Sequence, residues 1–315
     1  MPDYSPVSPQ VLRNTLLGAL VGLLLAIGVV FLMDFFDDTL SSPDQITSKL
    51  GLPVLAVISH FNMEPGKPIT ESHPRSPVSE AFRTLRTNVQ YTSVDRPLNT
   101  LLVTSADSSE GKTTVAVNLS VVLAQSGSRV TLIDADLRHP AIHKRLENPN
   151  RAGLSSLFIL SDVSLDGSVQ KTRIENLAVI TSGDLPPNPS ELLGSQKMGQ
   201  ILDQAKSFSD IVIIDTPPIM AVTDAAVLGA KVDGVLLVVE PGKTRLASAR
   251  HTVEQLQRVG ANLLGVVLNN LDMGSARYGY RYYYYKGYHY RYYNKYYIDE
   301  EGNRKPAKKS KGKAA

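Results

Sequence analysis

The sequence predicts a protein of the α/β class built on a doubly wound parallel sheet, and two observations support this prediction. From about residue 99 onward, apolar runs of strand length alternate with stretches of helical length. The runs are apolar along their whole length, which is typical of parallel strands that helices cover on both faces. The apolar runs are residues 100–105, 130–133, 177–181, 211–214, 235–239 and 263–268, and the helical stretches are residues 112–126, 190–206, 221–230 and 244–259.

The composition agrees with a folded chain of one large domain or two small ones. The chain has 315 residues, of which 43% are apolar and 20% are charged, so it can form a core and is not disordered throughout. It contains no Cys. This excludes a disulfide scaffold, a metal site with Cys ligands and a Cys nucleophile.

The first element in the chain is an apolar run over residues 16–33, which contains no charged side chain. At about 1.5 Å per residue, a helix of this length spans about 27 Å, close to the hydrocarbon core of a bilayer at about 30 Å. The alternatives are a signal peptide and a buried core helix. Because no small-residue cleavage site follows the run, we expect residues 1–36 to form a Pro-rich stretch and one transmembrane helix.

The next segment, residues 37–75, has the signals of a juxtamembrane unit followed by a linker. A short helix is expected to start at Ser42-Pro43 and to end at Gly51, and residues 53–58 have the pattern of a strand. Residues 60–78 are rich in Pro, Ser and charge, and a new helix is expected near Ser76. We therefore expect the main domain to cover residues 76–272.

The last segment, residues 273–315, is expected to be a disordered tail that is rich in Tyr and basic. Of the 14 Tyr in the chain, 12 lie between Tyr278 and Tyr297. From residue 277 onward the chain holds 11 Lys or Arg against 3 Asp or Glu, whereas the rest holds 22 against 27. A basic tail on a mildly acidic body favours anionic partners such as a membrane surface, nucleic acid or an acidic polymer.

The clearest chemical signal follows the first strand of the predicted sheet. Residues 105–114 read Ser-Ala-Asp-Ser-Ser-Glu-Gly-Lys-Thr-Thr, which is a loop that ends in Gly-Lys-Thr at the start of a helix. Such a phosphate loop directs backbone N–H groups and the positive end of the helix dipole at phosphates. Lys112 is then expected to reach the β- and γ-phosphates, and Thr113 to hold Mg²⁺. Ala106 departs from the standard motif, which has Gly at that position.

Acidic residues follow two further strands of the sheet. Asp134 and Asp136 come after the run at 130–133, and Asp215 comes after the run at 211–214. Ligands of open parallel sheets gather at the carboxyl ends of the strands, so these carboxylates are expected to meet the phosphate loop. Carboxylates at such a site suit Mg²⁺, and one of them can accept a hydroxyl proton during phosphoryl transfer.

Together these motifs resemble the bacterial tyrosine kinases that act on capsule and exopolysaccharide export. The resemblance rests on the unusual phosphate loop, Asp134-x-Asp136-x-Arg138, Ile-Ile-Asp215-Thr-Pro-Pro and the terminal Tyr cluster. Residues 1–60 are similar to the end of a polysaccharide chain-length determinant. In this family the three motifs are called Walker A, Walker A′ and Walker B. Relative to the family, Ser108 and Ser109 replace a Pro-Gly pair, and the large periplasmic domain of the fused members is missing from this chain.

The resemblance implies ATP and Mg²⁺ as cofactors and assigns roles to individual residues. Lys112, Asp134, Asp136 and Asp215 are expected to be catalytic, with Asp134 activating the Tyr hydroxyl, although its role and that of Asp136 can be exchanged. Thr113, Asp136 and Asp215 are expected to organise the metal. The residues expected to bind the nucleotide are Ser108, Ser109, Glu110, Gly111, Lys112, Thr113, Thr114 and Asn269.

The tail supplies the expected phosphoacceptors. A flexible Tyr-rich segment can reach the active site of a neighbouring subunit, and many targets raise the local concentration of substrate. A low-complexity tail and a polymer-binding surface are the alternatives. The expected acceptors are Tyr278, Tyr280, Tyr282, Tyr283, Tyr284, Tyr285, Tyr288, Tyr290, Tyr292, Tyr293, Tyr296 and Tyr297.

The resemblance also implies partners and a location. Glu80, Arg83 and Arg86 match a motif that packs kinase domains of this family into a ring, although three such residues on one helix face are otherwise typical of a solvated surface. Further expected partners are the polysaccharide chain-length and export machinery, a separate membrane activator and the anionic membrane surface, whereas nucleic acid is not expected. The protein is expected to cross the inner membrane once, with its kinase domain in the cytoplasm.

Two other functions stay open on the sequence alone. A partitioning or cell-division ATPase of the same fold has a signature Lys where this chain has Asp107, which argues against that class. A non-catalytic polysaccharide co-polymerase or scaffold, in which the nucleotide site only drives assembly, agrees with the departures in the phosphate loop. The expected activity is nevertheless autophosphorylation on Tyr by a protein-tyrosine kinase that controls polysaccharide polymerisation and export.

Overall fold

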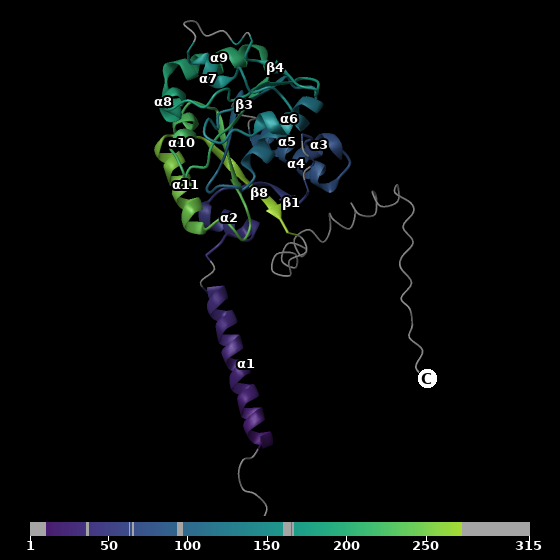
Figure 1. Cartoon of the computed structure of the whole chain (residues 1–315), viewed down its shortest axis with the longest axis vertical. Coiled ribbons are helices and arrows are strands. Elements are labelled where there is room, and N and C mark those ends of the chain that lie inside the picture. The colour runs from purple at the N-terminus through teal and green to yellow at the C-terminus, as the bar shows by residue number, and fades with distance from the viewer. Residues whose placement is uncertain are drawn as a thin grey trace, which may run out of the picture.

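The computed structural model contains one long helix followed by an α/β domain (Figure 1). It describes residues 11–35, 38–62, 64, 66–92, 97–159, 165 and 167–272. The predicted tail over residues 273–315, with all of its expected acceptor tyrosines, lies outside the described residues.

The domain is organised around an eight-stranded sheet whose strands lie in the order β1-β8-β7-β2-β6-β3-β5-β4. All neighbouring strands are parallel except β4 and β5, which form an antiparallel pair. The parallel strands therefore end at one common edge, as the buried apolar runs predicted. The strands are β1 Val54–Ser59, β2 Thr100–Ser105, β3 Val130–Asp134, β4 Gln170–Lys171, β5 Leu177–Ile180, β6 Ile211–Asp215, β7 Gly234–Val239 and β8 Leu263–Leu271.

Helices cover both faces of the sheet, and the alternation of side chains along β2 shows how. Leu101 and Val103 pack into the core under one set of helices, whereas Leu102 packs into the core under the other set. The first set is α3 Ile69–Ser72, α4 Pro77–Thr92 and α5 Lys112–Gln125, and the second is α8 Pro189–Gly194, α9 Gln196–Phe208, α10 Asp224–Gly229 and α11 Leu246–Arg258. Two short helices, α6 Ile142–Leu146 and α7 Leu154–Leu157, lie between β3 and β4 in the chain.

The segment before residue 76 is part of the same domain, although the sequence suggested a juxtamembrane unit and a linker. β1 pairs in parallel with β8 and is therefore an edge strand of the sheet. α2 Pro43–Leu50 has the predicted Ser42 cap and Gly51 end, and its Ile46 is fully buried beside α11. The boundary at residue 76 therefore does not coincide with an edge of the sheet, because β1 completes the apolar surface on which α4 packs.

The helical stretch predicted over residues 190–206 is two helices in the structure. α8 ends at Gly194, and Ser195 caps the start of α9 by accepting a hydrogen bond from the N–H of Met198. The stretch at 221–230 shortens to α10, Asp224–Gly229. The sequence pattern therefore indicated these helical regions but not the bounds of each helix.

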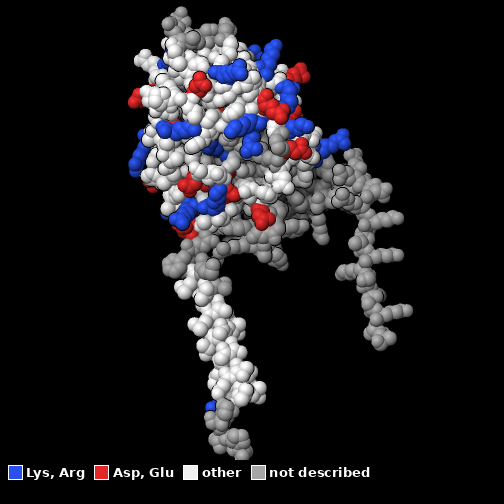
Figure 2. Space-filling model, viewed as in Figure 1, with Lys and Arg blue, Asp and Glu red and all other residues white. Residues whose placement is uncertain are grey.

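The first helix, α1 Val11–Phe35, stands apart from the domain, and Figure 1 shows it extending from one end. Its window Val11–Val29 has a mean hydropathy of 1.8, and none of that window is buried. In Figure 2 the part of its surface that is not drawn in grey carries no charge except at the end farthest from the domain. By length and composition α1 can cross a membrane.

Candidate active site

The phosphate loop forms between β2 and α5, as the sequence predicted. β2 ends at Ser105 and α5 begins at Lys112, so Gly111 is the residue before the first turn of the helix. Gly111 has a φ of 89°, and a Cβ atom there would collide with the side-chain amide of Asn269. A residue other than Gly would therefore be both strained and obstructed at this position.

The two departures from the standard loop have different structural consequences. Ala106 is fully buried and is not among the residues with positive φ, so its methyl group fits where the motif has Gly. Ser109, in contrast, has a φ of 61° and occupies the left-handed region, which costs an L-residue about 1–2 kcal/mol. The Ser in place of a family Gly is thus accommodated at a cost in backbone strain.

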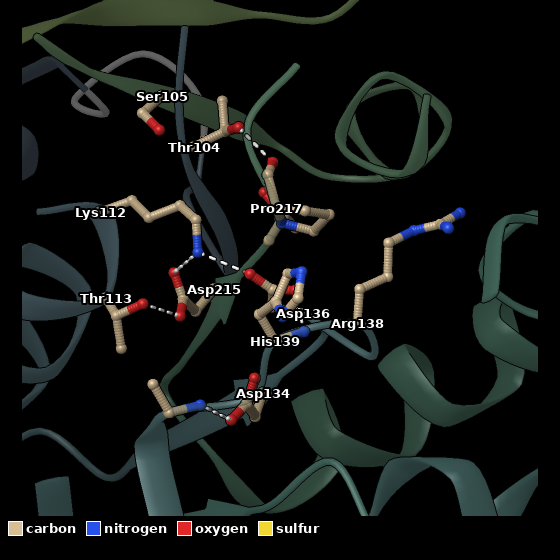
Figure 3. A network of polar contacts seen from close by, with 12 residues as sticks. Thr104, Ser105, Lys112, Thr113, Asp134, Asp136, Arg138, His139, Asp215 and Pro217 are labelled. Atoms are coloured by element: carbon tan, nitrogen blue, oxygen red, sulfur yellow. Dashed lines mark hydrogen bonds and ion pairs between the residues drawn. The ribbon is translucent and has the colours of Figure 1, made fainter. Parts of the chain in front are cut away.

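The predicted catalytic residues meet at the carboxyl edge of the sheet (Figure 3). Lys112 Nζ lies 2.7 Å from Asp136 Oδ2 and 4.0 Å from Asp215 Oδ1. Thr113 Oγ1 donates a hydrogen bond of 2.6 Å to Asp215 Oδ2. Asp134 and Asp215 are register partners at the ends of β3 and β6, which explains why residues 81 positions apart share one site.

Two carboxylate oxygens in this site are buried without a hydrogen-bond partner. Asp134 Oδ2 accepts hydrogen bonds from the N–H groups of Ala141 (3.2 Å) and Ile142 (3.0 Å), whereas Asp134 Oδ1 has no partner. Asp215 Oδ1 also lacks a hydrogen-bond partner. Buried acceptors without a donor are costly in a folded protein and mark places where a metal ion, a proton or a water molecule can bind.

Burial dominates the electrostatics of the site. It raises the pKa of Asp134 and of Asp215, and their mutual repulsion adds to the effect on Asp134. Burial alone would lower the pKa of Lys112, but the carboxylates of Asp215 and Asp136 outweigh it and raise that pKa. Lys112 therefore stays charged and holds the carboxylates together in the nucleotide-free protein.

Arg138, the last residue of the Asp134-x-Asp136-x-Arg138 motif, points away from Lys112 in Figure 3. It donates to both carboxylate oxygens of Asp224, at 3.0 and 3.2 Å, and to Ser190 Oγ at 3.1 Å. Asp224 is fully buried. The motif thus connects the carboxylates after β3 to the start of α10.

Two residues that the sequence analysis did not identify as part of the site form hydrogen bonds with the phosphate loop. Thr244 donates a short hydrogen bond to Glu110 Oε1, and Lys243 Nζ donates to Ser109 O at 2.7 Å. Both residues follow β7 at the carboxyl edge. Pro241-Gly242 directly after that apolar run was the only signal in the sequence of a turn at this place.

Asn269 and Glu110 also form hydrogen bonds that stabilise the phosphate loop. Asn269 Nδ2 donates to the backbone oxygen of Glu110 at 3.0 Å, while its Oδ1 is buried without a partner. Glu110 Oε2 accepts from the N–H of Asp107 at 3.0 Å, and burial raises the pKa of Glu110 to about 7. The contact of Asn269 with adenine, expected from the resemblance, stays a prediction.

The residues of the expected ring interface lie on α4 and have partners within their own chain. Arg83 pairs with Glu80 and donates to the backbone oxygen of Pro74 at 2.8 Å. Arg86 donates to the backbone oxygen of Val122 on α5 at 3.1 Å. Their role between subunits stays a prediction.

Comparisons with known proteins agree with the fold. Residues 103–266 match a family model described as "AAA domain". The chain is 44% identical over 213 residues to "Tyrosine-protein kinase YwqD" of Bacillus subtilis (strain 168), covering 67% of this chain and 90% of the relative. Longer relatives, such as two from Ralstonia and one from Escherichia coli, are matched over only 38% to 41% of their own length.

Solved structures with a similar fold also include a bacterial tyrosine kinase. "The kinase domain of Escherichia coli tyrosine kinase ETK" superposes with a TM-score of 0.70 at 33% identity, covering 75% of this chain and 97% of that one. The "chimerical protein CapA2B2" superposes with a TM-score of 0.69 at 37% identity, covering 73% and 100%. From its sequence, its sheet and its phosphate-loop site, the chain belongs to the family of bacterial tyrosine-protein kinases.

Proposed function

We propose that the protein is a kinase that transfers the γ-phosphoryl group of ATP to tyrosines in the tail of a neighbouring subunit. The observation that carries the proposal is the arrangement of Lys112 against Asp136 and Asp215 at the start of α5. A lysine held by carboxylates in the nucleotide-free protein is ready to turn to phosphate. The amides of residues 108–114 and the dipole of α5 bind the same phosphates.

The residues present fit a Mg²⁺ ion. Asp215 Oδ1 is buried without a hydrogen-bond partner, and Thr113 and Asp215 are already in contact through Oγ1 and Oδ2. Thr113, Asp136 and Asp215 would hold the ion directly or through water, as expected of Mg²⁺ at a phosphate site. Bound there, the ion supplies positive charge that stabilises the transferring phosphoryl group.

Asp134 is the proposed acceptor of the tyrosine proton. Its Oδ1 has no hydrogen-bond partner, whereas Asp136 already accepts from Lys112 (2.7 Å) and from the N–H of His139 (2.9 Å). Burial raises the pKa of Asp134, so its ionised form is a stronger base toward a phenol of pKa about 10 than an exposed Asp would be. Asp134 is fully buried, and the proposed route of the proton from the attacking tyrosine oxygen to its carboxylate is through one water molecule.

The experiment that tests this function follows phosphotyrosine in mixtures of two chains with Mg·ATP. One chain ends at Asp272 and keeps the catalytic residues, and the other is the full chain with Lys112→Met. We expect neither chain alone to become labelled and the mixture to be labelled on the tail of the Lys112→Met chain. That result requires transfer between chains, because the active chain has no tail and the tailed chain has no active site.

A mixture that stays unlabelled although the chain ending at Asp272 binds Mg·ATP would contradict a kinase acting between subunits. The matched control is the unaltered full chain, which should label itself under the same conditions. If the full chain in a lipid membrane binds ATP without forming phosphotyrosine, the assembly-only scaffold is the better description.

We further propose that α1 anchors the kinase in the inner membrane, with the domain in the cytoplasm, where ATP is available. The window Val11–Val29 of α1, which is unburied and has a mean hydropathy of 1.8, supports this proposal. The full chain should float with lipid vesicles in a density gradient, even in high salt, whereas a chain that begins at Asp38 should not. Recovery of the full chain in the soluble fraction would contradict the proposal.

The physiological role proposed from the family is control of the chain length and export of a capsular or extracellular polysaccharide. A separate membrane activator is a further proposed partner, as the resemblance to the family implies. In this chain the membrane helix and the kinase domain are joined covalently. The proposed route of this control is phosphorylation and assembly of the kinase.

A further inference from the structure

The loop after β7 together with the first residue of α11, residues 240–246, lies between the phosphate loop and the residues that follow α1. The segment concerned, residues 38–40, is the first part of the chain described after the helix. Figure 1 shows α2, which begins shortly after this segment, at the end of the domain nearest α1. We call residues 240–246 the relay loop and residues 38–40 the exit segment.

On its outer side the relay loop is paired with the exit segment through the backbone. The N–H of Leu40 donates to Thr244 O at 2.9 Å, and the N–H of Gly242 donates to Leu40 O at 2.8 Å. The N–H of Leu246 donates to Asp38 O at 3.0 Å. Leu40 is fully buried in a core with Ile46, so the exit segment cannot shift without breaking this packing.

On its inner side the relay loop is bonded to the phosphate loop. The hydroxyl of Thr244 donates to Glu110 Oε1 and accepts from the N–H of Glu240 at 2.9 Å. Glu110 in turn accepts from the N–H of Asp107 with its other oxygen, at 3.0 Å. Thr244 is fully buried, and Glu110 is 1% exposed, so water cannot replace either bond without rearrangement.

One residue therefore contacts both sides: Thr244 binds the exit segment with its backbone oxygen and the phosphate loop with its hydroxyl. We propose that Thr244 is a positioning residue that couples nucleotide binding at the phosphate loop to the placement of the segment leaving the membrane helix. The coupling is reciprocal, because a segment that stabilises the binding-competent loop must itself be stabilised when nucleotide binds. The inference rests on the proposed function only in requiring that the loop binds nucleotide.

The first test compares variants of the full chain in their affinity for Mg·ADP, measured by calorimetry. Thr244→Val keeps the shape of the side chain and removes the hydroxyl, and it should weaken binding about tenfold, within the usual range of coupling between sites. Thr244→Ser keeps the hydroxyl and should bind like the unaltered chain. Thr252→Val is the matched control, because Thr252 on α11 is also fully buried but its hydroxyl has no hydrogen-bond partner.

The second test measures hydrogen exchange of peptides that cover residues 38–46, with and without saturating Mg·ADP. Nucleotide should slow exchange of the Leu40 amide several-fold in the unaltered chain and in Thr252→Val, and it should leave exchange unchanged in Thr244→Val. A purely structural role of Thr244 would change exchange equally with and without nucleotide. This measurement on the unaltered chain needs no substitution, so it decides the question even if Thr244→Val does not fold.

The outcomes separate this inference from the proposed function. If Thr244→Val binds Mg·ADP as tightly as the unaltered chain, or if nucleotide leaves exchange over residues 38–46 unchanged, the coupling is wrong. If the unaltered chain binds Mg·ADP but forms no phosphotyrosine, the kinase proposal fails and the coupling is judged by the two tests alone. If the unaltered chain binds no nucleotide, both are wrong.

Discussion

Replacing Lys112 by Met is expected to reduce phosphotyrosine formation at least about a hundredfold. Lys112 is the side chain that both counters the charge of Asp136 and Asp215 and can turn to the phosphates of the nucleotide. Removing one such electrostatic contact from an active site costs about 10²–10³ in rate. The measurement is the initial rate of phosphotyrosine formation by the purified full chain with Mg·ATP.

The same substitution should lower thermal stability, because it leaves buried carboxylates next to each other without a cation. Lys206→Met is the matched control: Lys206 lies on α9 and pairs only with Asp203, whose side chain is 73% exposed, so rate and stability should hardly change. In a cell, Lys112→Met should also alter the length distribution of the exported polysaccharide on a gel. A Lys112→Met chain with more than a tenth of the original rate would remove Lys112 from the mechanism.

Replacing Asp134 by Asn should have opposite effects on activity and on stability. Activity should fall about 10²–10⁴-fold, the usual contribution of a general base. The nucleotide-free protein should become more stable at neutral pH, because burial raises the pKa of Asp134 and the folded state therefore opposes its ionisation. Each kcal/mol gained corresponds to about 2–4 °C in melting temperature for a domain of about this size.

The sign of this change in stability follows from how ionisation of Asp134 depends on pH. A carboxyl group whose pKa is higher in the folded than in the unfolded state loses protons more easily on unfolding. It therefore destabilises the fold as the pH rises above about 4, where an exposed Asp ionises. Asp134→Asn should remove part of this loss, and melting curves between pH 5 and pH 8 measure it. If Asp136→Asn abolishes activity while Asp134→Asn retains it, the two residues have exchanged roles.

The sequence alone indicated that the predicted catalytic residues lie close together, because each of them is placed by the carboxyl end of a buried parallel strand. Asp134 and Asp215 are the last residues of β3 and β6, and Lys112 begins the helix after the loop that follows β2. β6 is the parallel neighbour of both β2 and β3, so the carboxyl ends of the three strands lie side by side. Thr113 directly follows Lys112, and Asp136 lies two residues after Asp134, so both are carried to the same site by their neighbours in the chain.

The support of the site could not be predicted, because it depends on which strands become neighbours. Thr244 and Glu110 are 134 positions apart, and their contact exists only because β7 lies beside β2 in the sheet. The place of β1 at the edge was missed for a similar reason, since a short strand before a polar stretch carries no sign of its distant partner β8. The support of the phosphate loop and the place of β1 depend on pairing between strands that are far apart in the sequence. The predicted catalytic residues, in contrast, lie in short motifs that can be identified locally.

The two buried carboxylate oxygens without partners, Asp134 Oδ1 and Asp215 Oδ1, also affect how long the protein survives. Nucleotide and a metal ion that bind beside these oxygens would stabilise the fold by mass action, by about 2.7 kcal/mol at a ligand concentration of 100 times Kd. Proteases act on the unfolded fraction, which this stabilisation lowers about a hundredfold. The abundance of the kinase in a cell would then follow the supply of ATP, and copies that have lost their nucleotide would be the first to be degraded.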